Sequence, residues 1–224
     1  MTFPVHLYLH AKRIGCVVFG ICLFFANAYA MTFEVVMLRA EPAIKATGEI
    51  LQGDAERLKA VLVPMAKHSY GYYAMVLDSP GGDVAAAFEI SRLMDKYPIH
   101  TYIAPNAKCI SACAAIVFIA GKEHVAVPGS YLGFHGCYSG DTKAIIQLCN
   151  ARIAEHAFQH GTAYGSVMAF IQEIPYDEIV WITGDQADCW GINKYAISSK
   201  PNGYEKCVRD AMNAALMSFQ KKAK

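Results

Sequence analysis

Residues 78–83 read DSPGGD, and this segment stands between a buried apolar run and a helical pattern at residues 84–97. Pro80 fixes one backbone dihedral angle and removes a hydrogen-bond donor. Gly81 and Gly82 permit backbone conformations that other residues avoid. The segment predicts a tight strand-to-helix turn, with the free N–H groups of the new helix pointing back at it. Such donors suit a developing oxyanion, although a plain connecting turn remains the alternative.

Strand patterns alternate with helix patterns on both sides of this turn. The expected strands are residues 33–38, 44–50, 73–77, 99–104, 124–127 and 131–134. The expected helices are residues 54–65 (with Asp54 as its cap), 84–97, 110–120, 142–159, 164–173 and 203–221. Strands separated by helices imply crossover connections, so the fold class is α/β with a mainly parallel sheet. Ligand sites of such sheets lie at the carboxyl ends of the strands.

The bulk composition fits one folded domain. Of the 224 residues, 54% are hydrophobic and 17% charged, which argues against disorder. The formal net charge is +1, and no long basic run is interleaved with aromatic residues. We therefore expect no nucleic-acid partner.

The first thirty residues predict a signal peptide. Lys12 and Arg13 precede an apolar run at residues 14–25, and an A-x-A pattern ends at Ala30. The apolar run is shorter than the roughly 20 residues of a spanning helix. We expect residues 1–30 to be removed and residues 31–224 to form an exported, periplasmic or secreted domain. An uncleaved membrane anchor is the alternative.

The expected export places the cysteines of residues 31–224 in an oxidising compartment. They are Cys109, Cys113, Cys137, Cys149, Cys189 and Cys207. An even count favours disulfides, with the connectivity open. Zinc is less favoured, because no C-x-x-C pair occurs and no histidine pair at ligand spacing lies beside these residues.

Three pairings follow from sequence distance. Cys137 with Cys149, and Cys189 with Cys207, each span a short segment. The four-residue spacing of Cys109 and Cys113 places Cβ atoms about 5–6 Å apart on a regular helix, whereas a disulfide needs about 3.5–4.5 Å. That pair can close only if the backbone between them departs from helix. Otherwise the two thiols pack as small hydrophobes or pair elsewhere.

A serine lies between this last pair, in the segment CISACAA (residues 109–115). Ser111 stands among small residues at the start of a buried helix, where a substrate carbonyl can approach. We expect its own N–H and that of Ala112 to be free helix-start donors. The alternative is a serine that caps the helix.

A histidine ends the next apolar strand, in YLGFHG (residues 131–136). A neutral imidazole at His135 could take the serine proton and return it to a leaving group. The alternative is a hydrogen-bonded structural histidine.

The order and spacing of these three segments resemble the proteolytic subunit of the Clp protease. Signal peptide peptidase A has a similar S-P-G-G turn and serine with a lysine base. The resemblance covers about residues 47–197 and includes GEI at residues 48–50 and the closing segment IVWITGDQADCWGI at residues 179–192. It implies a crotonase-like ββα superhelix.

The resemblance also implies roles for single residues. Ser111 matches the nucleophile, His135 the base, and Ala112 with Gly82 (or Gly81) the oxyanion donors.

The sequence departs from this family at the third catalytic position. Ile179 stands where the family has an aspartate. Asp177 is our candidate by a local shift, with Glu178 beside it, while Asp185 and Asp188 are less favoured. Lys108 and Lys122 are the lysines that could suggest a serine–lysine dyad.

We therefore expect an exported, ATP-independent serine peptidase that acts on polypeptides. No cofactor and no ATPase partner are expected. Residues 142–173 match the family's ring-joining region and imply a homo-oligomer. The alternative is a catalytically inactive binding or scaffold protein, which the departure at Ile179 favours. An acyl-CoA enzyme is disfavoured, because a serine and histidine in this order have no role there.

Overall fold

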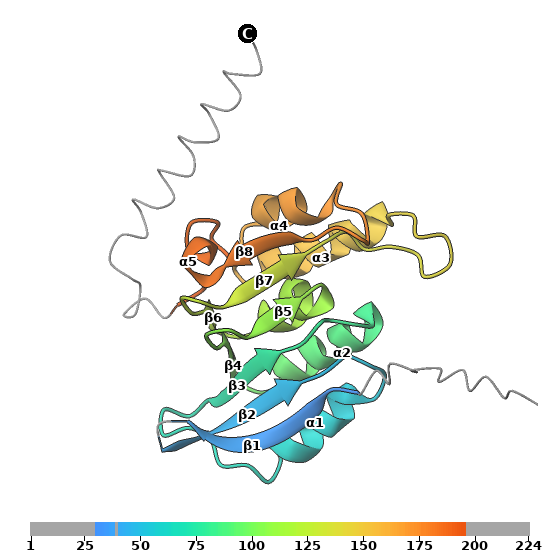
Figure 1. Cartoon of the computed structure of the whole chain (residues 1–224). Helices are drawn as coiled ribbons and strands as arrows, with labels where there is room; N and C mark the ends of the chain where they lie inside the picture. Colours follow the sequence, from blue (N-terminus) through green and yellow to red (C-terminus); the bar gives the residue numbers. More distant parts are fainter. Residues whose placement is uncertain (1–29, 39, 196–224) are drawn as a thin grey trace, which may run out of the picture.

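Eight strands form two sheets in residues 30–38 and 40–195, the part of the chain that the computed structural model describes. The first sheet has the order β1-β2-β3-β4-β6 and the second the order β5-β7-β8 (Figure 1). The strands are β1 (Thr32–Leu38), β2 (Glu41–Thr47), β3 (Tyr73–Asp78), β4 (Ile99–Ile103), β5 (Lys108–Ile110), β6 (His124–Ala126), β7 (Tyr131–Phe134) and β8 (Val180–Thr183). β1 runs antiparallel to β2, and β8 antiparallel to β7. The other pairs are parallel.

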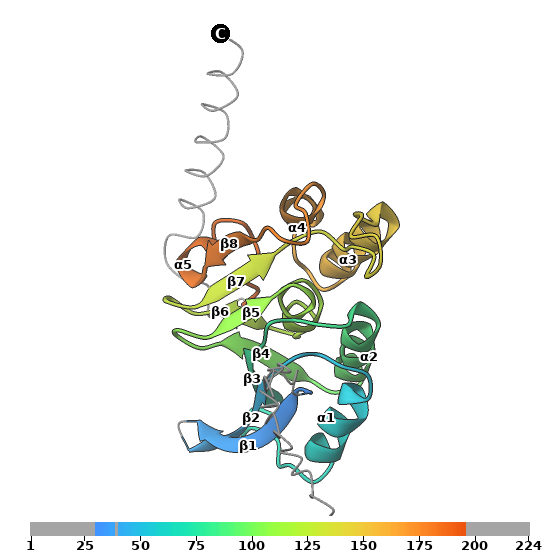
Figure 2. The same cartoon turned by 45° about the vertical axis from the view of Figure 1, so that its right-hand side comes forward.

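The helices are α1 (Asp54–Leu62), α2 (Val84–Met94), the π-helix η1 (Cys113–Phe118), α3 (Gln147–Gln159), α4 (Tyr164–Ile171) and the short α5 (Gly184–Ala187). Helices α1 to α4 lie along one side of the strands, and the short α5 lies on the other side (Figure 2). The core between the layers is apolar. Ile44 and Leu77 of the sheet are fully buried there, together with Leu58 and Ile90 of the helices.

β5 joins the two sheets. Its residue Cys109 forms a parallel bridge with Ser79 at the end of β3, and the strand then pairs with β7. The Ser79 N–H donates to the Lys108 carbonyl at 2.8 Å, and the Ile110 N–H donates to the Ser79 carbonyl at 3.0 Å. The carboxyl ends of β3, β5 and β7 are thereby brought to one edge.

The expected α/β class is confirmed, with three local corrections. Ile110 belongs to β5, so the helix expected at 110–120 is the shorter π-helix that begins at Cys113. Residues 142–146 form a projecting loop, and α3 begins at Gln147 (Figure 1). Gly53, at a φ of 86°, takes the N-cap position expected for Asp54, whose carboxylate accepts from the Leu51 N–H and pairs with Arg57.

The remaining boundaries agree within a few residues. The second strand begins and ends three residues earlier than expected, because β1 and β2 form a hairpin in which Leu38 faces Glu41. Residues 1–29, with the expected signal peptide, and the expected helix at 203–221 lie outside the described residues. Within the described ranges, no helix has the length and apolar character needed to cross a membrane.

Candidate active site

The glycine turn after β3 is in contact with the serine segment after β5. Gly81 has a φ of 91° and Gly82 a φ of 143°. A Cβ atom on Gly81 would collide with the carbonyl oxygen of Ile110 and would lie 2.8 Å from the Cβ of Ser111. Only glycine allows this turn and this close approach together.

Ser111 is the single residue between strand β5 and the helical turn that leads into η1. Its φ is 56°, in the left-handed region that side chains rarely adopt. Its N–H donates to the Gly133 carbonyl of β7 at 2.7 Å, and its carbonyl accepts from the Ala115 N–H at 2.9 Å. The expectation that the Ser111 N–H is a free donor is therefore wrong, because the pairing of β5 with β7 continues through this residue.

Two of the expected oxyanion donors are free. The Gly81 N–H donates to the Ser79 hydroxyl at 3.1 Å. The N–H groups of Gly82 and Ala112 have no acceptor in the part of the chain that the structure describes. Ala112 is the N-cap residue of η1, where a helix leaves its first donors unpaired, and Gly82 immediately precedes Asp83, the N-cap residue of α2.

His135 follows β7 directly and is half-buried. Its Nδ1 lies 2.9 Å from the carbonyl oxygen of Gly136. Because a carbonyl only accepts, Nδ1 carries the proton in this contact, and Nε2 of the neutral ring is left as the acceptor. The ring thus has the tautomer that a general base needs.

A single cleft brings these residues together. Its volume is about 610 Å³, and Ser111, Ala112, His135, Gly81 and Gly82 all line it. The apolar part of its wall is formed by Val84, Ala115 and Ile153. Two carboxylate residues, Glu49 and Asp83, also line it. The Asp83 carboxylate caps α2 by accepting from the Ala86 N–H at 2.7 Å. The arrangement offers a hydroxyl, a ring nitrogen and two backbone donors in one hollow.

The candidates for a third polar group lie away from this cleft. Asp177 and Glu178 are exposed in the loop before β8, and neither lines the cleft. Asp185 is in α5, and Asp188 accepts hydrogen bonds from Asn193 and Tyr195. The Gly136 carbonyl occupies the position at Nδ1 that a carboxylate would take.

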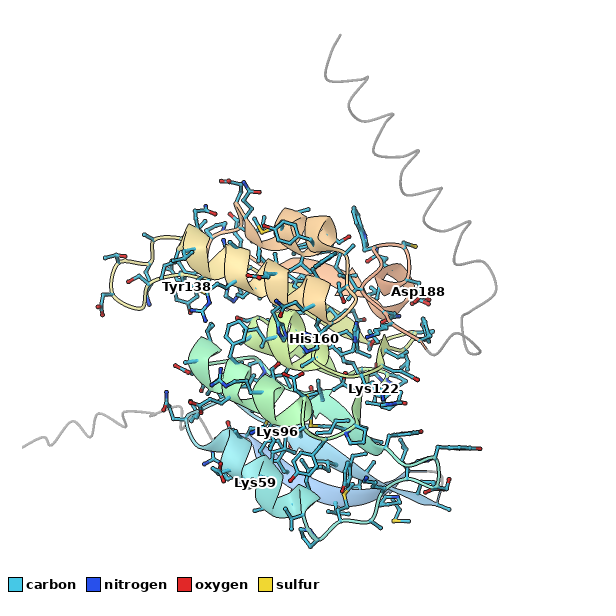
Figure 3. The ribbon with its side chains drawn as sticks, turned by 180° about the vertical axis from the view of Figure 1, so that it is seen from behind. Lys59, Lys96, Lys122, Tyr138, His160 and Asp188 are labelled. Atoms are coloured by element: carbon cyan, nitrogen blue, oxygen red, sulfur yellow. A yellow bond between two sulfur atoms is a disulfide. The ribbon has the colours of Figure 1, made fainter. Side chains whose placement is uncertain are left out.

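The two candidate lysines also lie elsewhere. The Lys108 ammonium lies 5.9 Å from the centre of the Trp181 ring. Lys122 lines a different hollow, which it shares with Lys96 and His160. Figure 3 shows Lys122 well separated from Tyr138, which lies on the wall of the serine cleft.

An aromatic group beside His135 was not anticipated. Tyr138 and Gly140 line the cleft, and the ring centres of Tyr138 and His135 are 5.6 Å apart. The Lys143 ammonium lies 5.4 Å from the ring centres of both Tyr138 and Tyr176. No sequence pattern indicates this cluster, because it depends on a small hairpin in which Tyr138 bridges Ile145.

Two disulfides flank the site. Cys109 is bonded to Cys113 across Ser111, and Cys137 to Cys149 across the hairpin. Of the third candidate pair, Cys207 lies outside the described residues. The described ranges contain no group of three side chains that could hold a metal ion.

No protein-family model matches the chain, and no curated protein matches its sequence. Solved structures do match. A serine-to-alanine variant of the 1510-N membrane-bound stomatin-specific protease has a TM-score of 0.50 at 18% identity, over 66% of this chain and 75% of that chain. A lysine-to-alanine variant of the same protease, in complex with a substrate peptide, has the same score and identity over 66% and 71%.

A variant of ClpP1 from Listeria monocytogenes has a TM-score of 0.49 at 18% identity, over 65% of this chain and 84% of that chain. At these identities the likeness to the stomatin-specific protease concerns the fold alone. This chain has the Clp-protease-like, crotonase-type α/β fold, as the resemblance implied.

Proposed function

We propose that this chain is an exported serine peptidase that works without ATP, with Ser111 as nucleophile and His135 as base. The observation that carries the proposal is the convergence of Ser111, His135 and two free backbone donors on one cleft. None of these features alone distinguishes an active site from ordinary capping and turns. Together they supply the nucleophile, base and oxyanion donors of acyl transfer.

The proposed reaction assigns one step to each of these groups. The Ser111 hydroxyl attacks the scissile carbonyl carbon while Nε2 of His135 takes its proton. The N–H groups of Gly82 and Ala112 donate to the oxyanion that forms. When the C–N bond breaks, His135 returns the proton to the leaving amine, and water then releases the acyl group from Ser111 by the reverse sequence.

In this proposal the Gly136 carbonyl orients His135 in place of a carboxylate. The carbonyl holds the Nδ1 proton and therefore the tautomer. Being neutral, it stabilises the imidazolium less than a carboxylate would, so we expect a slower enzyme than a full triad gives. Asp177, the candidate from the sequence, remains the residue to test against it.

The proposed substrate is a polypeptide. A solved structure with this fold holds a substrate peptide, which supports the class of ligand. Two disulfides in the described part of the chain are compatible with an oxidising compartment, and residues 1–30 carry the expected signal peptide. An exported chain meets no ATP supply, so the proposal includes no ATPase partner.

We also propose that the mature protein self-associates through the region of α3 and α4. Residues 142–173 match the ring-joining region of the Clp family, and α3 exposes Leu148 and Phe158 at 74% and 66%. Contact surfaces are marked by contiguous apolar patches rather than by single side chains, so this part of the proposal rests on the match to the ring-joining region. Light scattering at micromolar concentration should give a mass above that of the monomer, and a monomeric mass would remove this part of the proposal.

The peptidase proposal is tested with a fluorophosphonate probe on the purified mature protein. Mapping of the labelled peptide should place the adduct on Ser111, and Ser111→Ala should abolish labelling while the melting temperature stays nearly constant. The opposite outcome has two parts: the wild type is never labelled, and Ser111→Ala loses about 1 kcal/mol of stability, as for a lost helix cap. That outcome would favour the scaffold alternative.

A further inference from the structure

The backbone turns from strand to helix within one residue at Ser111. β5 ends at Ile110, and Ser111 alone adopts the left-handed φ of 56° before η1 begins at Cys113. A residue with a Cβ atom keeps such a conformation only where its surroundings hold it there. The hydrogen bonds of Ser111 to Gly133 and Ala115 supply part of that restraint.

A disulfide spans the same turn. Cys109 is the middle residue of β5 and Cys113 is the first of η1, and their Cα atoms are 5.3 Å apart. In a continuous strand, residues four apart are about 13 Å from each other. In a regular helix, their Cβ atoms stand farther apart than a disulfide allows. The bridge is therefore compatible with the turn and with neither regular alternative.

We infer that the Cys109–Cys113 bridge positions the nucleophile. This inference rests on the proposed function and adds to it a covalent restraint on the same site. The bridge joins the residues on either side of the turn and so excludes the extended and helical conformations of Ser111. Those conformations would turn both the Ser111 hydroxyl and the Ala112 N–H away from the cleft. The proposed reaction needs both groups there.

The bridge is a permanent brace rather than a redox switch. Cys109 and Cys113 are both 0% exposed, within the core formed by η1 and the strands. A reductant or partner thiol must reach a sulfur atom to exchange with it, so the native fold shields this bridge. The neighbouring bridge between Cys137 and Cys149 involves half-buried residues and lacks this protection.

The test compares the double variant Cys109→Ala/Cys113→Ala with the wild type and with Leu58→Ala. Leu58 is fully buried in α1 and lines no part of the cleft, so it controls for loss of core packing. The readouts are the rate of fluorophosphonate labelling and its pH dependence, the melting temperature, and amide hydrogen exchange across residues 110–116. If the double alanine variant does not fold, Cys109→Val/Cys113→Ala restores apolar volume in the strand.

We expect the double variant to label at least tenfold more slowly, with an unchanged pH profile and faster exchange at residues 110–116. Leu58→Ala should lower the melting temperature by a similar amount and keep the wild-type labelling rate. A double variant with wild-type labelling and exchange overturns the inference. A wild type that is not labelled removes the proposed function instead, and faster exchange in the double variant would still show that the bridge holds the Ser111 turn.

Discussion

The catalytic design proposed here depends on what holds the His135 ring. The Gly136 carbonyl accepts a hydrogen bond from Nδ1 at 2.9 Å, and no carboxylate of the described residues hydrogen-bonds to this ring. A carbonyl fixes the tautomer but supplies no full negative charge. The nucleophile, base and donors can still retain part of the rate of a complete triad.

His135→Gln should lower the rate of Ser111 acylation at pH 7 by about 100-fold or more, because general base catalysis is lost. Asp177→Asn is the matched comparison and should change the rate by less than about twofold, since Asp177 is exposed and outside the cleft. Both rates are measured by fluorophosphonate labelling. An equally large loss in Asp177→Asn would mean that this carboxylate reaches His135 in solution.

Gly81→Ala should destabilise the protein and abolish labelling. The φ of 91° alone costs an alanine about 1–3 kcal/mol, and the new Cβ also meets Ile110 and Ser111. Gly140→Ala is the control, because Gly140 lines the same cleft with no atom within 4 Å of its added Cβ. Urea unfolding and labelling measure both effects. Equal stability of the two variants would contradict the close packing described for the Gly81 turn.

The sequence placed Ser111, His135 and the glycine turn in order, and the structure brings them to one cleft. The sequence alone does not identify which N–H groups are free. That depends on two acceptors, the Ser79 hydroxyl within the same turn and the Gly133 carbonyl of β7. Contacts of this kind leave no periodic signal along the chain.

Among the elements, the apolar strands were predictable and the irregular ones were not. β7 matches its expected range and β3 extends one residue beyond it, because each is a short, mostly buried apolar run between turns. β5 was missed because it has only three residues and ends at the unusual φ of Ser111. The loop before α3 was predicted as helix because its sequence does not show the hairpin that the Cys137–Cys149 bridge closes.

The two disulfides should differ in their response to a reductant. Under native conditions with dithiothreitol, alkylation should appear first at Cys137 and Cys149, which are half-buried and close the hairpin onto the first turn of α3. Cys109 and Cys113 should remain unmodified until the protein unfolds, because both are fully buried.

Mass mapping of alkylated peptides over time decides the order. Opening the hairpin bridge should also cost about 3 kcal/mol of unfolding free energy, as expected for a closed loop of this size. Simultaneous alkylation of all four cysteines would show that the core around η1 opens as readily as the hairpin.

At the scale of the whole molecule, two buried histidines connect the helices to the rest of the fold. His124 of β6 contacts the Gly121 carbonyl through Nδ1 at 2.9 Å and the Thr162 hydroxyl through Nε2 at 3.0 Å. His156 of α3 contacts the Ile116 carbonyl of η1 through Nε2 at 3.1 Å. Burial lowers the pKa of each histidine to about 4, against the opposing effect of these hydrogen bonds. Both rings are therefore neutral in the folded protein at pH 7.

This burial predicts that the protein loses stability between about pH 6.5 and pH 4. In that range an unfolded histidine, with a pKa near 6.5, binds a proton that the folded one does not. The free energy of unfolding is therefore highest above pH 6.5 and falls as the pH is lowered, by about 2 kcal/mol for each histidine at pH 5. Urea unfolding at pH 7.5 and pH 5 measures this loss.

The control is the double variant His124→Gln/His156→Gln. It should be less stable at pH 7.5, and its free energy of unfolding should change much less between the two pH values, because most carboxylates titrate below this window. An unchanged slope in the double variant would assign the acid sensitivity to other groups.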